Sequence, residues 1–291
     1  MKRIIIFCLA LTLSSCSEII DVDINTVESS LVIYGHLSSD VERQRIEISK
    51  SVAYLSTGEN TTISSATVSV NDIYNYSFVD SLGYYLSDVA FGAEKDVDYT
   101  LKVNYDNQEY TATTTLADTT CITGGHLVKA SLMGIGYYTP FLTSSGLKDE
   151  EYWYVYFTYE DSILLEGLSD VSIIQASTLI GSEPYDYVPF LDMTNVNAMF
   201  FAEEDREMVE KMFDSTSTTQ PKFLATGDTI KISMCTITEG YYDFITVLNQ
   251  SSGSSNPIFG SGAVFLPSNI SNDAIGYFGS LNQKHIDIVV E

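Results

Sequence analysis

Short runs of alternating hydrophobic and polar residues dominate the first part of the chain. Residues 99–105 alternate with the period of two that a half-buried strand requires. Asp106 and Asn107 tolerate the positive φ of a tight hairpin turn, and residues 110–114 supply the returning strand. Similar units precede this one without any helical period among them. We therefore predict an immunoglobulin-like β-sandwich over residues 30–118.

The second part of the chain is also rich in β-prone residues, but two segments have a helical pattern. Residues 117–150 are rich in glycine, which favours a loose connection, whereas 152–159 reads as a strand. Residues 203–213 begin with acids and carry a lysine near their end, which matches the helix macrodipole. Residues 241–248 place their large apolar side chains on one helical face. We predict a mostly β protein whose second, β-rich domain (119–291) has one or two short helices covering a sheet.

The N-terminus has the pattern of an export signal. A basic start is followed by an apolar stretch over residues 4–13 and then by Ser14-Ser15-Cys16. This ending resembles a bacterial lipobox, so we predict a signal peptide over 1–15 and a lipidated Cys16 that begins a polar tether over 16–29. An ordinary secretory peptide cut elsewhere is the alternative. This ten-residue stretch is too short to span a bilayer, so anchoring in outer-membrane lipid would depend on the acyl chains of Cys16.

Composition and charge narrow the class of partner. The chain is 45% hydrophobic with 20 Tyr and 14 Phe, which is typical of a folded protein. Its formal net charge is −25, and loss of Lys2 and Arg3 with the signal peptide makes it −27. Such an acidic surface repels phosphate backbones, so we expect no nucleic-acid partner.

Two cysteines remain after Cys8 leaves with the signal peptide and Cys16 is lipidated. Cys121 and Cys235 could form a disulfide in an exported protein, or they could be two separate buried thiols. Their spacing does not resemble a metal site. The sequence leaves both alternatives open.

Candidate chemistry is sparse. The three histidines, His36, His126 and His285, are isolated in sequence, and no nucleophile, zinc or phosphate-binding motif accompanies them. We therefore expect no enzymatic activity and no cofactor, although a folded constellation could still unite a histidine with carboxylates. The acidic groups Asp96/Asp98 and 203–205 lack a complete calcium loop, so we interpret them as solvated acids and expect no metal.

An aromatic segment is the candidate binding surface. Residues 184–190 contain Tyr185, Tyr187 and Phe190 between two prolines, and we predict a loop there. Tyrosine combines a flat apolar face with a hydroxyl, which suits a partner or sugar surface. The alternative is a loop that packs onto its own domain.

Several sequence pieces together resemble a known family. They include 31–37, 66–70, 227–232, 240–244 and 276–280, in this order along nearly the whole mature chain. Their order and spacing are similar to those of Bacteroidetes lipoproteins of the domain-of-unknown-function-4249 family. The acidic stretch 201–213 departs from the family, since it is longer here. The resemblance implies an outer-membrane, surface-exposed lipoprotein, often encoded beside TonB-dependent receptors, and implies no established activity.

Two functional interpretations follow from these patterns. The first is a lipid-anchored cell-envelope binding or accessory protein that works with a TonB-dependent outer-membrane transporter. The second is a structural or adhesive surface lipoprotein, such as a fimbrial or matrix-associated subunit. Strand exchange in the second case requires an exposed edge strand or a detachable terminal strand, for which residues 286–291 are the candidate.

Overall fold

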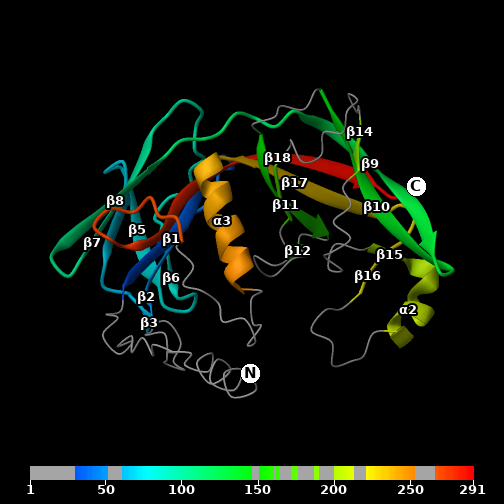
Figure 1. Ribbon diagram of the computed structural model, residues 1–291, viewed down its shortest axis with the longest axis horizontal. Helices are drawn as coiled ribbons and strands as arrows, with labels where there is room; N and C mark the ends of the chain where they lie inside the picture. Colours follow the sequence, from blue (N-terminus) through cyan, green and yellow to red (C-terminus); the bar gives the residue numbers. More distant parts are fainter. Residues whose placement is uncertain are drawn as a thin grey trace, which may run out of the picture.

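A computed structural model describes residues 30–51, 61–145, 151–159, 162–163, 172–175, 187–189, 200–212, 221–252 and 266–291. Most of them lie in two sheets (Figure 1), so the predicted mostly β class is confirmed. Cys16 and the predicted signal peptide and tether lie outside the described residues. None of the helices in the described part has the length and apolar character needed to cross a membrane.

The larger sheet has 13 strands and joins both ends of the chain. Its N-terminal strands are β1 (Leu31–Ser38), β2 (Arg45–Lys50), β3 (Thr61–Thr62), β4 (Thr67–Val70), β5 (Tyr74–Val79), β6 (Tyr84–Ser87), β7 (Tyr99–Tyr105) and β8 (Gln108–Thr114). Its later strands are β11 (Tyr152–Tyr159), β12 (Ser162–Ile163), β13 (Ser172–Gln175), β17 (Thr229–Ile237) and β18 (Ile275–Val289). The main order is β12-β11-β17-β18-β1-β2-β6-β5-β4-β7-β8.

The smaller sheet has five strands and packs against the C-terminal part of the larger one. Its members are β9 (Ile122–Leu132), β10 (Ile135–Ser144), β14 (Tyr187–Pro189), β15 (Phe200–Ala202) and β16 (Lys222–Leu224). One hydrophobic cluster contains side chains of both sheets, with Trp153 and Val155 of β11 meeting Tyr138 and Leu142 of β10. The glycine-rich stretch expected to be a loose connection is therefore the long β9–β10 hairpin. Its two-residue turn, Met133-Gly134, has positive φ at both positions.

The last strand, β18, connects the two parts of the larger sheet. Its first half pairs in parallel with β1, from Val32↔Ile275 to Ser38↔Leu281. Its second half pairs antiparallel with β17, from Thr236↔Asn282 to Thr229↔Val289. Figure 1 shows β18 in red, reaching from the N-terminal strands on the left to the C-terminal strands on the right. The hydrogen-bonded sheet therefore continues across the predicted domain boundary near residue 118.

The hydrophobic clusters, in contrast, divide close to that boundary. One cluster is built from residues between Leu31 and Leu116, with only Ile270, Ala274 and Phe278 added from the C-terminal part. The cluster between the two sheets begins at Cys121. Alternation explains the first cluster, because β1 and β7 bury every second side chain. Each half thus has its own core, and β18 contributes to both.

Side chains of β18 fix the segment between the halves. The Ser280 hydroxyl donates to the Thr115 carbonyl at 2.6 Å, and the Asn282 amide donates to the Ala117 carbonyl at 2.8 Å. The Lys284 ammonium donates to the Ile122 carbonyl at 2.5 Å. Since buried carbonyls are costly without partners, these three bonds hold the connection against the sheet.

The two predicted helices and the predicted β7–β8 turn agree with the structure. The acidic stretch forms a 3₁₀ turn, η6 (Glu203–Asp205), followed by α2 (Arg206–Met212), and the second helical pattern forms α3 (Glu239–Ser252). Asp106 and Asn107 have φ values of 52° and 60° in the turn between β7 and β8. The helix α3 packs on the face of the larger sheet that carries Cys235 and Leu281.

Candidate functional site

One face of the larger sheet carries a row of tyrosines from three of the four consecutive strands β11, β17, β18 and β1. Cross-strand pairs share a face, and the registers Tyr34↔Tyr277, Tyr154↔Cys235 and Tyr156↔Ser233 place these side chains together. We call this surface the tyrosine face; its sheet tyrosines are Tyr34, Tyr152, Tyr154, Tyr156 and Tyr277. The helix α3 covers part of it with Tyr241, Tyr242 and Phe244.

Tyr241 anchors α3 to the sheet. Its side chain is fully buried, and its ring lies over Gly279 of β18, where a Cβ would come within 2.8 Å of the ring atoms. Gly240 leaves space for the Tyr277 hydroxyl in the same way. The rings of Tyr241 and Tyr277 stack with centroids 5.5 Å apart. The two glycines therefore permit a close approach that any side chain would prevent.

A chain of polar groups runs through this aromatic contact. The hydroxyls of Tyr34 and Tyr241 are 3.0 Å apart, and the Tyr241 hydroxyl is 3.4 Å from Nδ1 of His36. Burial raises the pKa of Tyr241 well above its usual value and also raises the pKa of Tyr34. Burial, with a smaller contribution from nearby Arg45, lowers the pKa of His36 to about 4. At neutral pH all three groups are therefore uncharged hydrogen-bonding partners.

The lowered pKa of His36 predicts a pH-dependent stability. An unfolded histidine has a pKa near 6.5, so between pH 6.5 and about 4 the unfolded chain binds a proton that native His36 does not. Stability from this residue is complete above pH 6.5 and falls as the pH drops through that window, by at most about 3 kcal/mol. The loss of stability is measured from the denaturant midpoints of the wild type and of His36→Gln at pH 7 and pH 4.5. We expect the pH-dependent loss to be smaller in the variant; equal losses would contradict the assignment.

A second polar network lies on the same face where β1 ends. The Asp40 carboxylate is 2.7 Å from Nε2 of His285, and Nδ1 of His285 is 2.8 Å from the Ser233 hydroxyl. The carboxylate favours a proton on Nε2, so Nδ1 accepts a hydrogen bond from the Ser233 hydroxyl. These residues come from the end of β1, from β18 and from β17. The fold thus brings a histidine together with a carboxylate, a possibility that the isolated histidines of the sequence had left open.

This network contains the three residue types of a Ser-His-Asp triad, but its serine is not accessible to a substrate. Ser233 lies in the middle of β17 and is only 1% exposed, with the side chains of Tyr156 and His285 at neighbouring cross-strand positions. A catalytic serine must reach a substrate carbonyl, and a catalytic triad presents the nucleophile openly. The geometry fits a structural hydrogen-bond network better than a nucleophile.

Gln283 extends this network across the two halves of the chain. Its backbone N–H donates to the Ser39 hydroxyl at 2.8 Å, and its side-chain amide donates to the Ser38 hydroxyl at 2.5 Å. The Tyr156 hydroxyl donates to the side-chain amide oxygen Oε1 of Gln283 at 2.8 Å. Burial raises the pKa of Tyr156 to about 12, so its hydroxyl stays protonated. Where β1 turns away from β18, side chains thus supply the hydrogen bonds that backbone groups supply earlier along the two strands.

The comparison with known families identifies the chain. The family described as Domain of unknown function (DUF4249) matches residues 17–287. The chain belongs to this family. A search of the curated proteins finds no match.

The DUF4249 chain folds so that three of the sequence pieces that suggested the resemblance meet at the tyrosine face. Residues 31–37 supply Tyr34 and His36, 240–244 supply Tyr241, and 276–280 supply Tyr277 and Gly279. No two of these pieces are neighbours in sequence. Their contact gives a physical reason for the pattern, because the glycines and tyrosines fit one another across α3 and β18.

The predicted cysteine pair lies in two different clusters of this DUF4249 protein. Both cysteines are buried thiols, and no disulfide joins them. Cys121 packs in the cluster between the sheets, whereas Cys235 faces α3. Burial, which is the main cause, raises the pKa of Cys235 far above its usual value. Of the two alternatives, the structure has separate buried thiols.

The aromatic segment predicted as a loop is only partly described. Tyr185 and Phe190 lie outside the described residues. Tyr187 belongs to the short strand β14, where it pairs with Thr143 of β10. At this position the predicted loop is wrong, because the extended Tyr187–Pro189 backbone joins the smaller sheet.

Of the acidic groups considered for calcium, those at 203–205 have separate partners. Glu203 pairs with Arg206, Glu204 pairs with Lys129, and Asp205 accepts the Gly136 N–H at 2.6 Å. Among the residues that the structure describes, no three acidic, histidine or cysteine side chains gather as a metal site would require. The carboxylates at the start of α2 therefore tie the helix to itself and to the β9–β10 hairpin.

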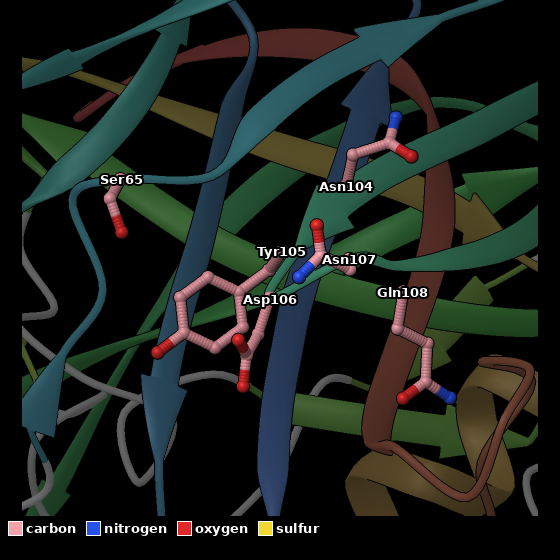
Figure 2. A pocket seen from close by; sticks show the side chains of 6 residues that line it. All are labelled: Ser65, Asn104, Tyr105, Asp106, Asn107 and Gln108. Atoms are coloured by element: carbon pink, nitrogen blue, oxygen red, sulfur yellow. The ribbon is translucent and has the colours of Figure 1, made fainter.

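A polar hollow of about 640 Å³ lies at the β7–β8 turn. Ser65 and residues 104–108 line it, and Figure 2 shows their side chains spread in different directions rather than converging. A ligand site needs polar groups that converge on one place. The hollow therefore does not compete with the tyrosine face as the candidate site.

Proposed function

We propose that this protein is a lipid-anchored binding or accessory protein of the cell envelope, working beside a TonB-dependent outer-membrane transporter. The N-terminal pattern ending at Cys16 supports the anchor, and the family match begins at the next residue. Outer-membrane location and exposure at the cell surface belong to the same proposal. The resemblance to transporter-associated lipoproteins supports the partner.

The tyrosine face is the observation that carries the binding role. It gathers half-buried tyrosines beside Asp40, Gln283 and His285, and the polar side chains come from both halves of the chain. Tyrosine-rich surfaces with a polar rim are common at binding sites. The burial of Ser233 supports a non-catalytic role.

The alternative is a structural or adhesive surface lipoprotein. Assembly by strand exchange would require residues 286–291 to act as a detachable terminal strand. Ile286 and Ile288 are instead buried in the core between the sheets, and β18 is hydrogen-bonded inside the larger sheet. Detaching residues 286–291 would expose the core between the sheets, which weighs against that form of assembly.

A native pull-down tests the transporter partnership. The tagged, acylated protein is isolated from outer membranes in mild detergent, and the proteins that accompany it are identified by mass spectrometry. We expect a β-barrel transporter in stoichiometric amount, and we expect Cys16→Ser to lose acylation and to leave the membrane fraction. Recovery of the lipoprotein alone, or only with copies of itself, would refute the transporter role.

A further inference from the structure

The strand β9 forms one edge of the smaller sheet. It spans Ile122–Leu132 and pairs along its length with β10, whose other side carries β14 and β15. An edge strand presents a row of backbone groups that can accept another strand. Which of these groups point outward follows from the hairpin register.

The turn Met133-Gly134 sets this register. Its flanking residues, Leu132 and Ile135, form the hydrogen-bonded pair that closes a two-residue hairpin. Alternate residues then direct their backbone groups away from β10. These outward-facing residues are Gly125, Leu127, Lys129 and Ser131.

Two observations on β10 agree with this assignment. Pro140 lies opposite Leu127 and has no N–H, so this pair cannot be one that exchanges two hydrogen bonds. Gly136 lies opposite Ser131 and donates its N–H to Asp205, away from β9. Both pairs are therefore non-hydrogen-bonded pairs, and the backbone groups of Leu127 and Ser131 face outward.

The edge of β8 is covered, whereas among the described residues no strand other than β10 pairs with β9. Thr111 of β8 accepts the Ser271 N–H at 2.9 Å and donates its own N–H to the Ser271 hydroxyl at 2.8 Å. Asn272 donates to the Glu109 carbonyl at 2.7 Å. Within the described part of the chain, the four outward-facing residues of β9 have no such backbone partners. Covering an edge is how proteins prevent strand addition, so an open edge of this length is unusual.

The side chains along the edge suit an added strand. Val128 is 38% exposed and Met133, at the tip, is 91% exposed. The one charged side chain of β9, Lys129, is engaged in an ion pair with Glu204 of η6. It therefore blocks the edge less than a free lysine would.

We propose that the β9 edge is the docking site for an extended, basic segment of a partner protein, which adds to the smaller sheet as a strand. This inference rests on the proposed function, since it names how the partner is held. The negative charge of the protein favours a basic occupant: the mature chain carries −27, and the five acids of η6 and α2 next to the hairpin outnumber the two bases of these helices together with Lys129 of β9. A second copy would bring an equal negative charge to the same edge.

Peptide binding to the full, acylated protein in mild detergent tests this mode of docking. The probe is a labelled ten-residue peptide that alternates valine and lysine, and the comparison peptide has glutamate in place of lysine. Fluorescence anisotropy should show the lysine peptide binding at least about tenfold more tightly. Equal binding of the two peptides would overturn the basic character of the occupant.

A matched pair of variants isolates the backbone contribution. Lys129→Pro removes an outward N–H without removing a β9–β10 hydrogen bond, and Lys129→Ala removes only the side chain. We expect the proline variant to bind the lysine peptide about tenfold more weakly and the alanine variant to bind at least as tightly as wild type. Equal binding by the two variants would overturn strand addition.

Hydrogen exchange of the same amides gives a readout that needs no variant. The N–H groups of Leu127, Lys129 and Ser131 should exchange quickly in the protein alone and slowly with the lysine peptide, whereas Thr111 stays protected in both. Slow exchange without peptide would overturn the proposal, and protection that rises with protein concentration would assign the edge to a second copy. If Lys129→Pro still recovers the transporter in the pull-down, the edge assignment fails while the proposed function stands.

Discussion

Replacing Gly276 by alanine should destabilise the protein by at least about 4 kcal/mol. Gly276 pairs with Ile33 where β18 meets β1, and its φ is +125°. A Cβ there would overlap the Ile33 carbonyl oxygen and lie 2.8 Å from its carbonyl carbon. Because β1 is held on its other side by β2, it cannot move away from the added atom. The substitution combines a forbidden backbone conformation with a clash at the junction of the two halves.

Gly83 provides the matched control for this substitution. It has a φ of +74° in the turn between β5 and β6, and a Cβ there would meet no atom within 4 Å. Gly83→Ala should therefore cost only the conformational penalty, about 1–2 kcal/mol. Urea unfolding followed by far-UV circular dichroism and by the fluorescence of Trp153 measures both variants. Similar losses for the two glycines would show that the β1–β18 junction tolerates a side chain.

The elements predicted from the sequence are those whose causes are local. The β7–β8 hairpin can be predicted because the alternation in 99–105 and the residue types of Asp106 and Asn107 specify it within a few positions. The helix α3 can be predicted from the helical spacing of its apolar residues. The β9–β10 hairpin also carried a local signal, a two-residue turn with Gly134, but the number of glycines favoured a loose connection instead.

The candidate site depends on pairings that no local pattern specifies. Asp40 and His285 are 245 positions apart, and their contact exists only because β18 runs beside β1 before it joins β17. Parallel pairing of distant strands leaves no turn signal in the sequence. The tyrosines could be seen individually, but their common face follows from the register of four strands. The resemblance to the family located the right pieces without saying that they touch.

Replacing Tyr241 by alanine should cost about 3–5 kcal/mol, because it removes the fully buried ring that fills the space between α3 and Gly279. Tyr241→Phe keeps the ring and loses only the hydroxyl that contacts Tyr34 and His36, so we expect a loss of about 1 kcal/mol. Tyr242 is the neighbouring control: it is half-buried against Tyr152, and Tyr242→Ala should cost less than Tyr241→Ala.

A double-mutant cycle separates the hydroxyl contact from the packing of the ring. If Tyr34 and Tyr241 share a hydrogen bond, Tyr34→Phe and Tyr241→Phe together should cost less than the sum of the two single losses, by about 0.5–1 kcal/mol. Urea midpoints of the four proteins are measured at pH 7, where His36 of the wild-type protein is neutral. Strict additivity would mean that the two hydroxyls act independently. A Tyr241→Ala loss no larger than that of Tyr242→Ala would mean that α3 is held by other contacts, and the tyrosine face would then be open to movement of its covering helix.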